Sequence, residues 1–172
     1  IAQERPGARG DAGNFADRIE LENIQARFPL PDVSAAFKQN MGWGYVRAAG
    51  ILRLIKWDDL LDDDAFDLSG SATGWGLNFS SNVNATPNDV VRLQFVVGEG
   101  IQNYMNDSPV DIGIKNNFSD PVTPILGEPL PIIGLVAFLD HKFNDKFSST
   151  FGYSLQDIDN SDGQALDAAK PA

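Results

Sequence analysis

The chain has 172 residues, 24 acidic against 13 basic side chains, a formal net charge of −11 and no cysteine. This charge excludes nucleic acid as a partner, because phosphate contacts depend on clustered Lys and Arg. The lack of cysteine excludes disulfides, thiolate nucleophiles and zinc–thiolate sites. No run of about 20 apolar residues could cross a bilayer as a helix, so a membrane role would require strands.

Alternation of apolar with small or polar residues predicts long β-strands along most of the chain. In the clearest segment, Trp75, Leu77 and Phe79 point to one side, while Gly, Asn and Ser residues point to the other. The second side is typical of a crowded aqueous lumen, since a strand face in bulk water would carry many Lys, Glu and Thr. The predicted strands are 33–39, 44–57, 73–83, 90–101, 130–141 and 146–156.

The connections between these strands alternate between short and long. The tight turns are 40–43, 84–88 and 142–145, and the long connections are 58–70, 104–129 and 157 onward. Membrane barrels have short periplasmic turns and long outer loops, a sorting that soluble sandwiches and lipocalin-like barrels do not need. The predicted strands run about 9–14 residues, close to the length that a tilted strand needs to cross a bilayer. The sequence therefore predicts an all-β fold, an antiparallel transmembrane β-barrel.

Aromatic residues near the predicted strand ends indicate the two interfacial girdles of such a barrel. Residues 1–31 are predicted to be an irregular lead-in and 158–172 a loop end, while 17–28 fits either a short helix or a strand-like arm. The long connection 104–129 could fold into the barrel or stay outside it. The girdle candidates are Trp43, Tyr45, Phe143 and Phe147 beside short turns, and Trp57 and Tyr104 on the long-loop side.

Four stretches carry a family resemblance: the lead-in at 29–32 with the strands up to Asp59, GWGLNFSS, RLQFVVGEGIQNYMND and FLDHKFNDKFSSTFGYSLQDIDN. In order and turn spacing they resemble the C-terminal half of DcaP-like outer-membrane porins. The resemblance implies a sixteen-stranded, homotrimeric diffusion channel for small anionic or dicarboxylic solutes. It also implies a Gram-negative outer membrane, with the bilayer and lipopolysaccharide as partners. With only about six or seven strands, the chain is expected to be a fragment of such a barrel.

Candidate chemistry is sparse, so we expect no enzyme, no cofactor and no metal site. His141 is the only histidine and cannot build a zinc site or a Ser–His–Asp triad in the absence of a nucleophile elbow. The acidic stretch from Asp58 to Asp67 could capture Ca²⁺ but lacks the EF-hand spacing, so a solvated loop is the simpler interpretation. The alternative function is a non-conducting structural or adhesive outer-membrane barrel.

The candidate pore-lining residues are the basic side chains on the small, polar strand faces. Arg47 and Arg53 share a parity and lie about 20 Å apart at roughly 3.3 Å per residue, so they could form a ladder for anions. The competing interpretation is that each pairs with a lumenal acid such as Asp140. The full set is Lys38, Arg47, Arg53, Arg92 and Lys146.

Overall fold

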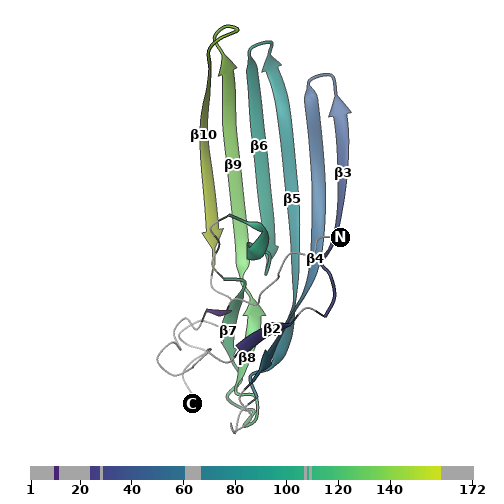
Figure 1. Ribbon diagram of the computed structural model, residues 1–172, viewed down its shortest axis with the longest axis vertical. Coiled ribbons are helices and arrows are strands. Elements are labelled where there is room, and N and C mark those ends of the chain that lie inside the picture. Colours follow the sequence, from purple (N-terminus) through teal and green to yellow (C-terminus); the bar gives the residue numbers. More distant parts are fainter. Residues whose placement is uncertain are drawn as a thin grey trace.

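The computed structural model describes residues 10–11, 24–27, 29–60, 67–106, 108 and 110–159. Long antiparallel strands lie side by side in one curved sheet (Figure 1). They coincide with the six predicted segments, apart from a few residues at their ends. No helix among the described residues is long and apolar enough to cross a membrane. The strands are β3 (Val33–Met41), β4 (Gly44–Asp59), β5 (Gly70–Thr86), β6 (Asp89–Glu99), β9 (Pro131–Lys142) and β10 (Ser148–Ile158).

The strand order follows the chain, as expected when neighbouring strands are joined by direct connections. The sheet runs β10-β9-β6-β5-β4, and β3 and β2 (Ile24–Arg27) both pair with β4. β5 pairs antiparallel with β6, and β9 with β10, which confirms both predicted pairings. Within the described residues, β3 and β10 each have a neighbour on one side only.

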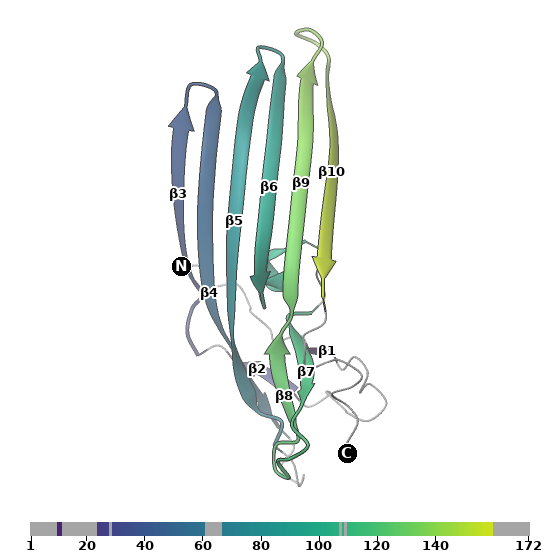
Figure 2. The same cartoon turned by 180° about the vertical axis from the view of Figure 1, so that it is seen from behind.

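Short turns and long connections lie at opposite ends of the sheet. The turns after β3, β5 and β9 are at the upper end of Figure 1, and the long connections after β4 and β6 are at the lower end, as Figure 2 shows from behind. Gly44 begins β4 with φ +144°, and a Cβ there would overlap the backbone oxygen of Asn82. Glycine is therefore required where β4 leaves the first turn.

Successive cross-strand rows of side chains alternate in polarity. An apolar row on the convex face is followed by a polar row on the concave face, because neighbouring residues of a strand point to opposite sides. The apolar row is Phe37, Ala48, Phe79, Phe95, Leu135 and Leu155. The concave row, polar except for Val136, is Lys38, Arg47, Ser80, Gln94, Val136 and Ser154.

The convex face exposes many large apolar side chains. Phe37 and Tyr153 are each 67% exposed, and Trp75, Leu77 and Phe79 are exposed on the same side. A soluble protein rarely leaves so large an apolar surface in water. On a barrel wall this is the surface that meets lipid.

The long connections contain structure that the sequence did not predict. Within 104–129 lies the hairpin β7 (Ile112–Asn116) and β8 (Ile125–Pro129), and the short β1 (Gly10–Asp11) pairs with β7. β2 pairs with the far end of β4, so the described part of 17–28 is strand-like rather than helical. Of the predicted loop end 158–172, Ile158 is the last residue of β10 and Asp159 follows it, and the remainder lies outside the described residues.

Trp57 is not part of an interfacial girdle. Its side chain is buried with Ile55 and Ile112, and its Nε1–H donates to the Leu68 carbonyl at 2.8 Å. Any Cβ at Gly127 would collide with the indole ring, so glycine makes room for it. The apolar contacts and a satisfied indole N–H hold Trp57 inside the long-loop end. On the short-turn side, Trp43, Phe143 and Phe147 are exposed as expected of a girdle.

The facing of the sheet predicts opposite outcomes for two adjacent residues. Phe95→Arg puts a charge on the convex face and should cost about 2–4 kcal/mol in a bilayer near its midplane. Gln94→Arg puts the same charge on the concave face and should cost far less. Urea unfolding from lipid vesicles measures both, and equal losses of stability would contradict this facing.

Candidate pore-lining site

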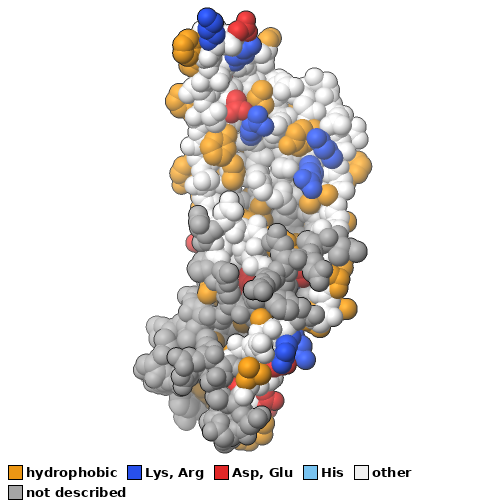
Figure 3. Space-filling view, in the orientation of Figure 1, with side chains coloured by type: hydrophobic (Ala, Val, Ile, Leu, Met, Phe, Trp, Pro, Cys, Tyr) orange, Lys and Arg blue, Asp and Glu red, His pale blue; other side chains and the backbone are white. Residues whose placement is uncertain are grey.

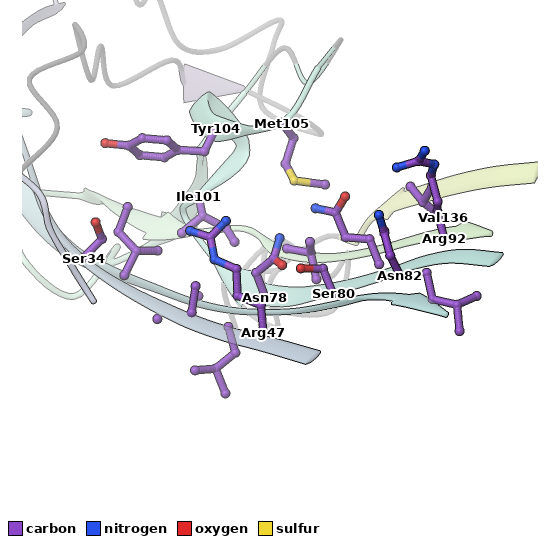
Figure 4. Close-up of a pocket in the computed structure, with 18 of the residues that line it drawn as sticks. Ser34, Arg47, Asn78, Ser80, Asn82, Arg92, Ile101, Tyr104, Met105 and Val136 are labelled. Carbon is purple, nitrogen blue, oxygen red and sulfur yellow. The ribbon is translucent and has the colours of Figure 1, made fainter. Parts of the chain in front are cut away.

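The concave face of the sheet holds a hollow of about 560 Å³. Strand residues form its floor, and Tyr104 and Met105 lie across from them (Figure 4). These two belong to η2 (Gln102–Tyr104) and the residue that follows it, so the beginning of the long connection folds over the concave face. The polar residues of the floor include Ser34, Arg47, Asn78, Ser80, Asn82 and Arg92.

Two cations lie side by side on this face. Arg47 is exposed and lies directly opposite Lys38 in the β3–β4 register, and neither has a carboxylate partner among the described residues. Lys38 Nζ lies 3.9 Å from the centre of the Tyr45 ring, a cation–π contact that leaves its charge in place. Tyr45 therefore lines the concave face and is not a girdle residue. Figure 3 shows two basic side chains over this part of the sheet with no acidic side chain beside them.

Arg92 is on the same face but is neutralised. Its Nε donates to Asp140 Oδ2 at 2.6 Å, and the Thr150 hydroxyl donates to the other oxygen of that carboxylate at 2.9 Å. With the Asn82 amide oxygen oriented toward Arg92, it accepts a further hydrogen bond from Nη1 at 3.0 Å. Arg92 is therefore paired with Asp140, the interpretation that competes with a role in selecting anions.

Arg53 lies on the predicted side of β4 but not in the hollow. Its side chain is fully buried, with Nε 3.1 Å from Asp32 Oδ2 and Nη1 3.7 Å from Asp111 Oδ1. Nη1 also donates to the Gly100 carbonyl at 2.5 Å. The expectation that Arg53 lines an aqueous lumen thus differs from the structure, because the segment that follows β6 covers it.

The same cluster fixes the covering segment. The Tyr104 hydroxyl donates to Asp32 Oδ2, and the Arg53 guanidinium carbon lies 5.3 Å from the centre of the Tyr104 ring. Gln102 is buried, and its Nε2 donates to the Leu130 carbonyl at 2.8 Å. Tyr104 is therefore not an interfacial girdle residue either. The contacts join the lead-in to β3, the middle of β4, η2 and the residue before β9.

Lys146 differs from the other four candidates. It lies in the turn between β9 and β10, because β10 begins at Ser148, so strand parity does not assign it a face. Its backbone N–H donates to the Asn144 side chain at 2.9 Å, and its side chain is exposed at the short-turn end. The structure therefore brings together Lys38, Arg47 and Arg92, and leaves Lys146 outside.

The described carboxylates of the acidic loop accept hydrogen bonds from neighbouring residues. Asp58 accepts from Arg27 Nε at 2.7 Å, and Asp59 accepts from the Leu68 N–H. Hydrogen bonds from the Ser69 side chain and backbone lower the pKa of Asp67, so this carboxylate is ionised at neutral pH. Among the described residues no group of three or more His, Cys, Asp or Glu could hold a metal ion. Residues 62–64 of the proposed calcium loop lie outside the described residues.

His141 also has a local partner. Its Nδ1 lies 2.6 Å from Asp89 Oδ1, and its ring meets Phe143 edge-on with centroids 4.5 Å apart. A lone histidine paired with one carboxylate at the end of a strand fits an anchoring contact.

The curved antiparallel sheet, apolar on its convex face and polar on its concave face, has the architecture of part of a β-barrel wall. Among solved structures, it is similar to the crystal structure of the outer membrane channel DcaP of Acinetobacter baumannii, with a TM-score of 0.60 and 17% identity. The match covers 88% of this chain and 38% of that chain. No protein-family model and no curated protein sequence matches the chain. At this identity, the similarity shows the fold.

The buried position of Arg53 predicts a large stability difference between two ion pairs. Asp32→Ala leaves the Arg53 charge buried and without its closest carboxylate, which should cost about 3–5 kcal/mol. Asp58→Ala removes a partner from the exposed Arg27 and should cost at most about 1 kcal/mol. Equal urea midpoints for the two variants would show that the Arg53 cluster is open to water.

Proposed function

We propose that this chain forms part of the wall of an outer-membrane channel through which small solutes diffuse, and that its concave face favours anions. The observation that carries the proposal is the pair Lys38 and Arg47, two adjacent cations without a described acidic partner on the polar side of a barrel wall. The similarity to the fold of an outer membrane channel supports the channel part of the proposal, but not the preference for anions. In an outer membrane, the short turns of such a wall would face the periplasm and the long connections would face outward.

The chemistry of these two groups suits a carboxylate. Arg keeps its charge at any working pH and offers paired donors that match the two oxygens of a carboxylate. At an effective dielectric near 20, a contact at 4 Å gives about 4 kcal/mol before desolvation. The net attraction must be much smaller, because a channel that held its solute so tightly would not release it. A weak, salt-sensitive preference for anions is the expected result.

The amide and hydroxyl groups around Arg47 support transient binding. Asn78, Ser80 and Gln94 line the same hollow and can exchange hydrogen bonds with a partly dehydrated solute. Tyr104 and Met105 offer apolar surface on the opposite side. The class of solute remains that of small anions, including dicarboxylates, and a homotrimer is the assembly that the family resemblance suggests.

A non-conducting structural or adhesive barrel is the alternative. It predicts that the intact protein inserts into planar bilayers without raising their conductance. Discrete conductance steps would exclude it, and their absence in verified, folded insertions would overturn the channel proposal.

Arg47 provides the direct test of anion preference. Arg47→Glu reverses an exposed charge in the hollow, so the anion-to-cation permeability ratio should fall about threefold at low salt, or roughly 0.7 kcal/mol at 1.4 kcal/mol per tenfold. The measurement is the reversal potential of the intact protein in planar bilayers under a salt gradient. The effect should shrink at high salt, because exposed charges are screened over about 10 Å at 0.1 M.

Lys146→Glu is the matched control, because it makes the same charge change at the short-turn end, outside the hollow. It should leave the permeability ratio nearly unchanged. If the two variants shift the reversal potential equally, the effect reflects overall charge, and Arg47 does not select anions.

A further inference from the structure

The beginning of the long connection is attached to the barrel wall by two different sets of contacts. One is the buried cluster of Arg53, Asp32 and Tyr104. The other is apolar: Ile101, only 3% exposed, packs with Val96 and Ile132 on the concave face. Together, these two sets of contacts fix both the position and the orientation of η2.

Glycines on the strands make this packing possible, because they have no side chain. A Cβ at Gly76 would come 2.5 Å from Ile101 Cδ1, and a Cβ at Gly98 would come 2.9 Å from the same atom. A Cβ at Gly134 would come 2.9 Å from Met105 Cε. The wall is therefore recessed at three strand positions, and the recesses are filled by Ile101 and Met105.

The attached segment narrows the space above the strands. Tyr104 and Met105 line the hollow from the side opposite Arg47 and Asn78 (Figure 4), and Met105 also lines a second hollow of about 530 Å³ beside Gly134 and Ser154. A solute in the first hollow lies between these two side chains and the strands.

We propose that Tyr104 and Met105 set the upper size of the solutes that pass, and that Asp32 and Arg53 are positioning residues that hold them in place. This inference rests on the proposed channel function but concerns size rather than charge. Because the attachment combines a buried ion pair with apolar packing, the segment is a fixed narrowing and not a lid that opens with each solute.

The chain contains two methionines, which gives a matched pair of variants. Met105→Trp enlarges the narrowing side chain, whereas Met41→Trp makes the same change on the exposed end of β3. In planar bilayers, Met105→Trp should lower the single-channel conductance and exclude neutral polyethylene glycols that the unmodified channel admits. Met105→Ala should shift the polymer cut-off to larger sizes, and Met41→Trp should leave it unchanged.

The positioning role has its own readout. Asp32→Asn keeps the size of the side chain but weakens its hold on Arg53 and Tyr104, so the polymer cut-off should shift upward and the open-channel current should become noisier. Asp58→Asn at the exposed Arg27 pair should change neither. A loss of stability in Asp32→Asn without any change in cut-off or noise would show a purely structural role and overturn this part.

A cross-link tests the attachment without using conductance. The chain has no cysteine, so Met105→Cys with Gly134→Cys should be bridged by a short bifunctional thiol reagent in the folded protein, because a Cβ at Gly134 would lie 2.9 Å from Met105 Cε. The directly opposed pair Val136→Cys with Ser154→Cys is the positive control, and Met41→Cys with Gly134→Cys is the negative control.

The outcomes separate the two proposals. If the channel conducts and the Met105 variants leave conductance and cut-off unchanged, the size role is wrong and the channel function stands. If the double variant Met105→Cys with Gly134→Cys fails to link while the positive control links, the attachment itself is wrong. If the link forms but the unmodified protein never conducts, the channel function fails, and the size role fails with it.

Discussion

Backbone hydrogen bonding in hydrocarbon is the constraint on which this structure depends. A strand that crosses a bilayer finds no water to satisfy its N–H and C=O groups, so neighbouring strands must supply every partner. The β4–β5 pairing runs without interruption from Gly44–Val83 to Trp57–Gly70, and β6–β9 runs from Asp89–His141 to Glu99–Pro131. Within the described residues, the outer edges of β3 and β10 have no such partners. In a membrane these edges require further strands, from the same chain or from another, before the wall can close.

The same constraint explains what the sequence could predict. A half-buried strand forces strict period two, so the alternation around Phe79 and Phe95 identified the strands, and short turns identified their antiparallel partners. Parity also identified the side to which Arg47, Arg53 and Arg92 point. The alternation along a strand does not show, however, whether a side chain is exposed or is buried under another segment of the chain. Arg47 and Arg53 share a face of β4, and only the folding of a segment some 50 residues later in the chain distinguishes them, as Arg53 contacts Gly100 and Asp111.

The long connection between β6 and β9 was the least predictable part. Its four prolines and short apolar runs are typical of a loop, and β7 and β8 are only five residues each. This hairpin is stabilised by tertiary contacts: Ile112 packs on Ile55 and Trp57, and the missing side chain of Gly127 leaves room for the indole ring. The aromatic residues Trp57 and Tyr104 were misassigned for the same reason. Position near a strand end suggests an interfacial girdle, but a neighbouring segment that covers the side chain gives it a different role.

Net charge is a poor guide to the field inside this wall. The chain as a whole is strongly acidic, yet on the concave face the acids Asp32 and Asp140 are each matched by an arginine. Lys38 and Arg47 therefore contribute positive charge with no described acid to cancel it. The described acids of the 58–67 loop lie at the long-loop end, where bulk salt screens a charge over about 8 Å at physiological ionic strength. Local pairing therefore matters more than the total charge: among the described residues of the concave face, the charges of Lys38 and Arg47 are the ones that no neighbouring carboxylate offsets.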